Sequence, residues 1–399
     1  MTAWRKFIAI SLPAVLVTGL LAALGIEIWV RATWNPKRGK PGFYLSDAVR
    51  GQRLASGYDG WFAGVPVHIN SLELRDSREY ALTKAPNTFR ILVLGDSVTF
   101  GHGAVHAYPE LLERRLRAWR PDVDWQVWNA GVPGYNTSNE LAHLLEVGPR
   151  FAPDLVIVGF FENDLADNRP IPAPGRAQRM VVAVDSWARR HLYSYEFYKR
   201  VALQVLWRYS ADKAYRERVD QLGSQDALFS STDDATTLAG QAITPYARLT
   251  DDDVAAVNCV YGMKASDETV PAMQRAAGFG AWLDAVHGFQ RLARDGSYRL
   301  VFFLNVVPPV CQDGDAFYDG GSSAVNAFFV KAMGEGVPTV SVYDEFLHRL
   351  PSQMPAARAH AFGNSNDVKA EVLFTFLRDR MLLAPGPSAP ASPTVPATH

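Results

Sequence analysis

The stretch that decides the fold is Phe89-Arg-Ile-Leu-Val-Leu94, followed by Gly95-Asp-Ser-Val-Thr-Phe-Gly101. The first half is a short apolar run, which predicts a buried strand that ends at Gly95. A serine that follows a buried strand and precedes a helix has its hydroxyl at the edge of the sheet, with backbone N–H groups near it. Ser97 therefore occupies a position where a nucleophile is useful.

Strands and helices alternate along the rest of the chain. Further strands are predicted at residues 124–128, 155–161, 299–307 and 338–342, and helices at 108–119, 275–294, 366–383 and from Thr137 onward. This alternation predicts an α/β fold in which helices cover both faces of a five-stranded parallel sheet. The pattern Thr137-x-x-Glu140 predicts a capping box at the start of its helix.

Three loops at the carboxyl ends of these strands carry residues that suit catalysis, and ligands bind at that edge of such sheets. The loops are Gly95–Gly101, Asn129–Thr137 and Glu162–Asp164. Ser97 would supply a nucleophile and its own N–H. Gly134 precedes a helix and would direct its N–H into the same cleft, and the Asn163 amide would donate a third hydrogen bond. Together these groups would form a nucleophile and an oxyanion hole.

The same loops resemble the SGNH (GDSL-type) hydrolase family. The matching motifs are GDSVTFG at 95–101, NAGVPGYNT at 129–137 and FEND at 161–164, and the resemblance covers about residues 65–383. The lead-in at 68–97 looks closest to membrane-anchored bacterial members. The resemblance implies a flavodoxin-like three-layer α/β/α fold, with Ser97 as nucleophile and an oxyanion hole from Ser97, Gly134 and Asn163. It also implies hydrolysis of an ester, often an acetyl group on a carbohydrate, with no metal and no cofactor.

The last motif of the family, an Asp and a His just before the final helix, is not matched. The stretch here is His360-Ala-Phe-Gly-Asn-Ser-Asn-Asp367, and aligning Asn366 with the family Asn puts Asn364 at the His position. An amide nitrogen is not basic, so Asn364 cannot accept the serine proton. His360 could act as the base only if the loop is rearranged, and His102, which follows the nucleophile loop, is a weaker candidate.

Two functions therefore stay open. The first is an envelope-anchored serine ester hydrolase that acts on acyl or O-acetyl esters of carbohydrates. The second is a catalytically degenerate protein of the same fold that binds glycan or scaffolds envelope assembly, and the missing Asp/His pair favours it. A nucleotide-binding domain is disfavoured because GDSVTFG lacks the G-x-G-x-x-G spacing.

The N-terminus contains an apolar run at residues 7–26 without a charged side chain. As a helix, such a run would span about 30 Å, the thickness of the hydrocarbon core of a bilayer. It predicts an uncleaved signal anchor, with a cleaved signal peptide as the alternative. The basic residues after it favour a cytoplasmic body by the positive-inside rule. The resemblance to exported proteins implies instead a body in the periplasm or otherwise outside the cytoplasm, and we adopt that orientation.

Composition sets the remaining limits. Lys and Arg total 40 against 41 Asp and Glu, a formal charge of −1 that leaves no electrostatic footprint for nucleic acid. Two cysteines exclude a four-cysteine zinc site. The predicted organisation is an anchor at 1–31, an irregular lead-in at 32–89, a hydrolase-like domain at 90–383 with an insert at 165–270, and a disordered tail at 384–399.

Overall fold

A five-stranded sheet forms the centre of the molecule. The computed structural model describes residues 3–34, 41–63, 65–168, 175–195, 198–199, 201–202, 268–306, 310–313, 316–319, 323–345 and 364–383. The strands are β5 (Thr88–Gly95), β6 (Asp124–Gly131), β7 (Leu155–Phe160), β8 (Leu300–Leu304) and β11 (Thr339–Ser341). Every neighbouring pair is parallel, in the order β11-β8-β7-β5-β6. The predicted five-stranded parallel sheet is confirmed.

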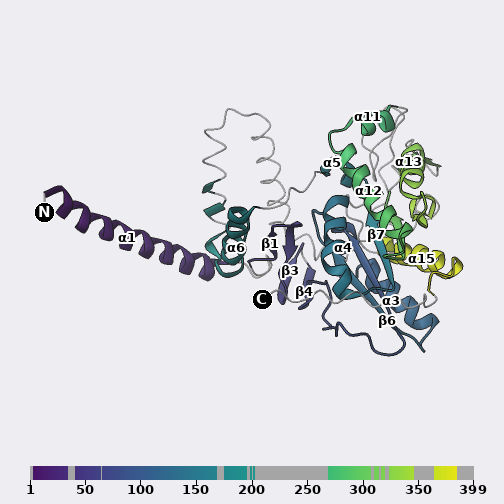
Figure 1. The fold of residues 1–399 in the computed structure, drawn as a ribbon, viewed down its shortest axis with the longest axis horizontal. Coiled ribbons are helices and arrows are strands. Elements are labelled where there is room, and N and C mark those ends of the chain that lie inside the picture. The colour runs from purple at the N-terminus through teal and green to yellow at the C-terminus, as the bar shows by residue number, and fades with distance from the viewer. Residues whose placement is uncertain are drawn as a thin grey trace.

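Helices cover both faces of this sheet and make three layers (Figure 1). They are α3 (Tyr108–Trp119) and α15 (Asn364–Asp379) on one face, and α4 (Thr137–Phe151), α12 (Phe279–Arg294) and α13 (Ser323–Met333) on the other. Leu112 and Leu373 share a core with Phe303 under the first pair. Trp128 and Trp282 belong to the core on the opposite face. The strands β7 and β8 are buried at every position, as a parallel sheet covered on both faces requires.

The described residues of the lead-in include four strands, which corrects the prediction of an irregular segment. It contains the strands β1 (Tyr44–Asp47), β2 (Gly51–Leu54), β3 (Tyr58–Phe62) and β4 (Val65–Ile69). They form two antiparallel hairpins, β1-β2 and β3-β4. Their apolar side chains share a third core with Phe100 and Val132, which lie in the loops that follow β5 and β6. Short strands between turn residues leave too little periodicity in the sequence, and packing against these loops stabilises them.

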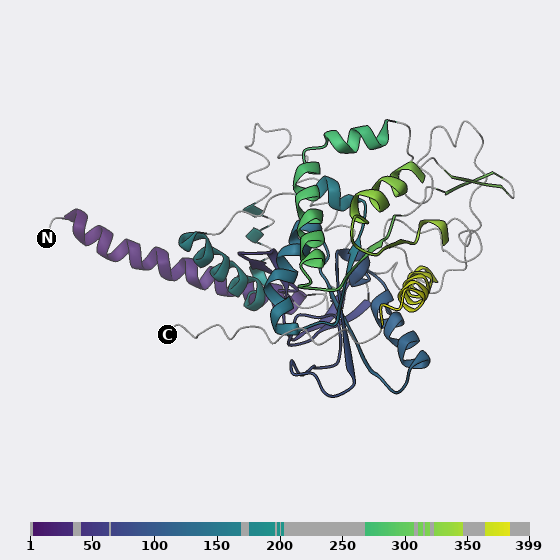
Figure 2. The same cartoon turned by 45° about the vertical axis from the view of Figure 1, so that its right-hand side comes forward.

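An apolar helix, α1 (Ala3–Thr33), precedes the hairpins. Its segment Ser11–Thr33 is long and apolar enough to cross a membrane, and 6% of its most apolar window is buried. The helix extends away from the body in both views (Figures 1 and 2). A single such helix near an N-terminus also fits a signal sequence, the alternative left open by the sequence.

The remaining elements are α2 (Ser97–Phe100), α5 (Asn163–Asp167), α6 (Arg176–His191), α11 (Thr269–Arg275), β9 (Val310–Asp313) and β10 (Ala316–Asp319). Most of the predicted insert and the whole predicted tail at 384–399 lie outside the described residues. The domain boundaries therefore stay predictions.

Candidate active site

The three loops singled out by the sequence follow three neighbouring strands, β5, β6 and β7, and begin at nearly the same level of the sheet. Gly95, the last residue of β5, pairs with the last residue of β6 and with Gly159 of β7. Ser97, Gly134 and Asn163 each follow that level by no more than four residues. Since β5 lies between β6 and β7, the loop with the serine is the middle one of the three. The fold thus brings all three predicted residues to the same edge of the sheet.

Ser97 is the first residue of the short helix α2 and is half-buried. Asp96 caps this helix, because its Oδ1 accepts the N–H of Val98 at 2.8 Å. The Ser97 hydroxyl donates to Asp96 Oδ2 at 3.3 Å, a long contact for an O–H donor. The turn requires glycine at position 95, where an added Cβ would lie 2.0 Å from Thr99 Oγ1.

The end of β6 is fastened to α2, and the lead-in supports the loop that follows it. The Asn129 amide donates to the carbonyl of Thr99 at 3.0 Å and accepts the N–H of Gly131 at 3.0 Å. Gly134 has a φ of +85°, a conformation that side-chain-bearing residues rarely adopt. The Gln52 side chain of β2 donates to the carbonyl of Pro133 at 2.8 Å, so a hairpin of the lead-in supports this loop.

The third loop places Asn163 at the start of α5 with an exposed side chain, and its neighbour Asp164 is buried. The helix that follows the second loop is capped by Asn136, whose side chain accepts the N–H groups of Ser138 and Asn139. The predicted capping box at Thr137 is thus wrong by one residue. Glu140, the expected partner in that box, is fully buried instead.

Arg75 of the lead-in holds the segment that follows Ser97. Its guanidinium donates to the carbonyls of Phe100, Gly101 and Ala104, with 2.7 Å to the second. It also lies over the Phe100 ring, 4.9 Å from the ring centre. Burial lowers the pKa of Arg75 to about 10, so the side chain stays charged at neutral pH. The lead-in therefore fixes the far end of the nucleophile loop.

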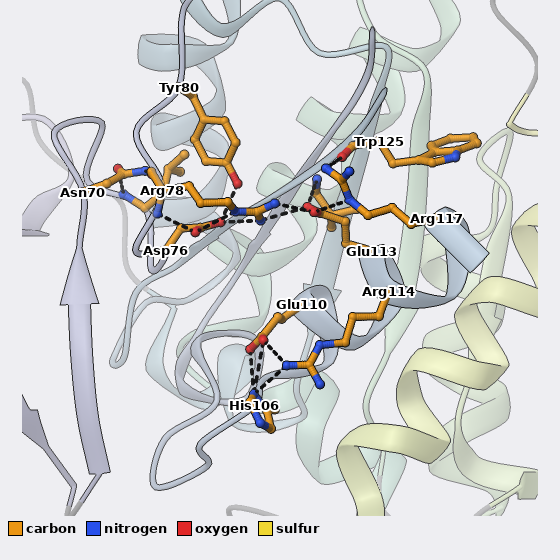
Figure 3. Close-up of polar contacts among 12 residues, drawn as sticks. Asn70, Asp76, Arg78, Tyr80, His106, Glu110, Glu113, Arg114, Arg117 and Trp125 are labelled. Atoms are coloured by element: carbon orange, nitrogen blue, oxygen red, sulfur yellow. Dashed lines mark hydrogen bonds and ion pairs between the residues drawn. The ribbon is translucent and has the colours of Figure 1, made fainter. Parts of the chain in front are cut away.

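A second contact of the lead-in reaches α3 through Arg78 (Figure 3). The Arg78 guanidinium bridges Asp76 and the buried Glu113, and Glu113 also accepts from Arg117 and from the N–H of Val127. This network links the lead-in, α3 and β6. None of its members belongs to the three predicted loops, so we interpret the network as structural.

Four ionisable side chains are buried near the candidate site. Asp96, Glu140, Asp164 and Lys369 are all at most 2% exposed. Burial raises the pKa of Asp96 to about 6, and the Lys369 charge partly offsets that rise. Burial also lowers the pKa of Lys369 to about 8, an effect that Asp96 opposes.

The two remaining carboxyls of this group lack the contacts that usually accompany burial. Burial, and then the charge of Asp96, raises the pKa of Glu140 well above its ordinary value. Burial, followed by Glu140 and Asp96, does the same for Asp164. Within the described part of the chain, neither Glu140 oxygen has a hydrogen-bond partner. Asp164 Oδ1 also has none there, and its Oδ2 accepts from Thr137 at 3.4 Å. We call Asp96, Glu140, Asp164 and Lys369 the buried charge cluster.

The sequence did not predict that these four side chains are buried. Lys369 lies on the second turn of α15, where a lysine ordinarily indicates a solvent-facing position. The sequence feature that could have indicated the burial of Lys369 is its place between Val368 and Ala370, which are both in the core. No group of His, Cys, Asp or Glu side chains among the described residues is arranged to hold a metal ion.

The described part of the chain does not identify a histidine as the base for Ser97. His360, the candidate base, lies outside the described residues, and Asn364 is the first residue of α15. The ring of His102 packs against Phe62 of β3, with 5.0 Å between ring centres. His106, which is exposed, contacts Glu110 on the surface of α3 (Figure 3). The identity of a base therefore stays a prediction.

One family model matches part of the chain. Residues 93–261, a range that includes all three loops, match the GDSL-like Lipase/Acylhydrolase family. None of the curated proteins matches the chain.

Several solved structures are similar at low identity. A two-domain esterase active on acetylated mannans, co-crystallised with mannopentaose, is 13% identical with a TM-score of 0.34; the match covers 77% of this chain and 53% of that one. An alpha/beta hydrolase from the metagenome of Lake Arreo, Spain, is 12% identical with a TM-score of 0.34 and coverages of 74% and 97%. An acetylxylan esterase from Geobacillus stearothermophilus is 17% identical with a TM-score of 0.19 and coverages of 43% and 88%. The chain thus spans about half the length of the first of these.

Proposed function

We propose that this chain, whose residues 93–261 match the GDSL-like lipase/acylhydrolase family, is a serine ester hydrolase held at the cell envelope by α1. The observation that supports this best is the register of β5, β6 and β7, which brings Ser97, Gly134 and Asn163 to one edge of the sheet. Acyl or O-acetyl esters of carbohydrates are the proposed substrates, on the resemblance of the three motifs.

In this proposal the Ser97 hydroxyl attacks the ester carbonyl carbon while a base takes its proton. The N–H groups of Ser97 and Gly134 and the Asn163 amide stabilise the negative charge that develops on the carbonyl oxygen. The bond to the alcohol oxygen breaks as that oxygen receives the proton. Water then hydrolyses the acyl-serine by the same steps, which releases the acid and restores the hydroxyl.

The base is the open part of the proposal. His360 is the candidate that the sequence offers. The contact between Ser97 and Asp96 adds a second one, because a carboxyl with a pKa raised to about 6 is ionised at pH 8 and is more basic than an ordinary aspartate. A general base contributes roughly 10²–10⁴ to the rate.

The test is hydrolysis of an activated acetyl ester by the full chain in detergent. Ser97→Ala should reduce turnover by about 10³-fold or more, because the nucleophile is removed. Ser297→Ala, at an exposed position, is the matched control and should leave turnover unchanged. Turnover that survives Ser97→Ala would overturn the proposed function.

Two further variants assign the base. His360→Ala should reduce turnover about 10²–10⁴-fold if His360 takes the proton, and Asp96→Asn should do so if Asp96 does. His106→Ala, which removes a surface histidine, is the control. If Asp96 is the base, turnover should also fall as the pH drops through about 6, where its carboxylate is protonated.

A second candidate function is favoured by a specific observation. The final helix α15 begins at Asn364, an amide, where the family motif has a histidine. The chain would then bind carbohydrate in the same cleft without hydrolysing it. No turnover on acetyl esters, together with saturable binding of acetylated mannan or xylan oligosaccharides, would replace the first proposal by this one.

A separate experiment tests on which side of the membrane the body lies. A reporter enzyme fused after residue 383 should be active only in the compartment outside the cytoplasm. Activity of a cytoplasmic reporter at the same position would reverse the orientation, since the positive-inside count favours that arrangement.

A further inference from the structure

The helix α6 turns its apolar side outward. Met180, Val181, Val184 and Trp187 are 68%, 64%, 63% and 58% exposed. Their spacing of one, four and seven residues from Met180 places them on one side of a helix. None of the α6 residues is buried. We call these four side chains the α6 stripe.

The side of α6 that contacts the body is polar. Asp185 accepts from the hydroxyl of Ser46 in β1, and Ser186 donates to the Ser46 carbonyl at 2.6 Å. Arg189 donates to Asp185 at 2.6 Å on the same side. A surface helix of a water-soluble domain has the reverse arrangement, with its apolar side toward the core. The polarity of α6 therefore indicates an apolar environment on its outer side.

The end of α6 is fastened to α1. Glu27 of α1 accepts the N–H groups of Tyr193 and Ser194 at 3.1 and 2.8 Å. Arg31 donates to the carbonyl of His191 at 2.8 Å and lies over the Tyr193 ring, 4.5 Å from its centre. Both views show α6 beside the end of α1 that meets the body (Figures 1 and 2). Any bilayer that α1 enters is thus close to the α6 stripe.

The charges and aromatic rings of this junction suit the surface of a bilayer. Arg176, Arg179 and Arg190 of α6 are exposed, and its one acidic residue, Asp185, is held by β1 and Arg189. Trp187 in the stripe is an aromatic residue of the kind enriched at the boundary between lipid and water. Basic residues flanking an apolar side that carries Trp are typical of helices that lie in the lipid headgroup layer.

We propose that α6 lies in the headgroup layer of the membrane that α1 enters, with the α6 stripe directed toward the acyl chains. The inference goes beyond the proposed hydrolysis and rests on α1 being a membrane helix. Two attachments at one junction hold the body in a fixed orientation on the membrane, whereas α1 alone would leave it free to swing.

The experiment uses the full chain in liposomes of phosphatidylcholine and phosphatidylglycerol. A photo-crosslinking amino acid replaces Val184 in the stripe, Val182 on the same helix, or Val105, which is 58% exposed in the body and serves as the matched control. We expect at least fivefold more lipid adduct from position 184 than from position 105, and less from 182 than from 184. Lipid adduct from 184 no greater than from 105 overturns the proposal.

Two outcomes of the crosslinking would show that protein, and not lipid, covers the α6 stripe. An adduct that doubles the mass of the chain shows that a second copy covers the stripe, and an adduct within the chain shows that another segment does. Either result overturns the proposal. Alkaline extraction of the same liposomes tests the premise: release of the chain into solution shows that α1 is no anchor, which also overturns the proposal but leaves the hydrolase assay in detergent unaffected.

Discussion

At the carboxyl end of the sheet, charged side chains are buried, whereas on α6 apolar side chains face outward. The buried charge cluster has exposures of 2% or less, and the α6 stripe has exposures near 60%. Both regions reverse the distribution that stabilises a soluble protein, and both reversals carry a free-energy cost. Such departures concentrate where a protein acts. The comparison therefore supports two different proposed partners, an ester at the first region and lipid at the second.

The largest effect on stability is expected from Lys369→Met. At pH 8 this variant leaves the ionised Asp96 in the core without its positive neighbour, which should lower the free energy of unfolding by about 3 kcal/mol. At pH 5 the wild-type Asp96 is already protonated, because its pKa in the folded protein is about 6, so most of the loss should vanish.

Denaturant unfolding in detergent, at pH 5 and at pH 8, tests this prediction. Lys331→Met, on the exposed surface of α13, is the control and should change stability by less than about 0.5 kcal/mol at either pH. A Lys369→Met loss that is equal at pH 5 and pH 8 would show that the lysine acts through packing, not through its charge.

A smaller effect of opposite sign is expected from Glu140→Met. The pKa of Glu140 is raised in the folded protein, so the wild type loses stability as the pH rises above the ordinary glutamate value near 4.5. An apolar side chain of similar volume removes that loss and should stabilise the protein by roughly 1–2 kcal/mol at pH 8. The gain should be smaller at pH 5, because that pH lies only slightly above the value near 4.5 at which the unfolded chain releases the proton that the folded protein retains.

The same unfolding measurement applies, with Glu335→Met on the exposed surface as the control. That variant should stay within about 0.5 kcal/mol of the wild type. Destabilisation by Glu140→Met would mean that the carboxyl takes part in a contact that its burial does not reveal.

The smallest effect on stability is expected from a substitution in the α6 stripe. Val184→Ser should change the free energy of unfolding in detergent by less than about 0.5 kcal/mol, because the Val184 side chain makes no part of the core. Leu144→Ala, in the core of α4, should cost about 2–5 kcal/mol in the same assay. If the two variants cost similar amounts, the α6 stripe is packed against protein.

The sequence predicted the sheet because its strands are apolar runs that end in glycine or polar residues. Such runs depend on local residue types alone, and β5 and β7 fall within a residue or two of their expected ends. The three loops of the candidate site were also predictable, since strand ends in a parallel sheet share an edge. Whether their N–H and amide groups converge on one point stays a prediction.

Other features depend on contacts that no local pattern encodes. Glu140 lies three residues after Thr137 and therefore indicated a helix cap, whereas the fold buries it in the core, where the charge of Asp96 acts on it. Lys369 is a charged residue on a helix, and its burial follows from the packing of α15 in the core that it shares with the sheet and α3. The reversed polarity of α6 was equally hidden, because a helical pattern does not indicate which side meets the body.

The hydrogen bonds from Arg75 to the carbonyls of Phe100, Gly101 and Ala104 limit how far the chain can be truncated from its N-terminus. A fragment that starts at β5 would keep every strand of the central sheet, yet it would lose the clamp on the segment after Ser97 and the hairpins that cover Phe100 and Val132. The smallest piece worth purifying for activity therefore begins before β1, near residue 41. In evolutionary terms, the lead-in and the sheet are expected to be inherited as one piece, with joints to other domains placed outside it.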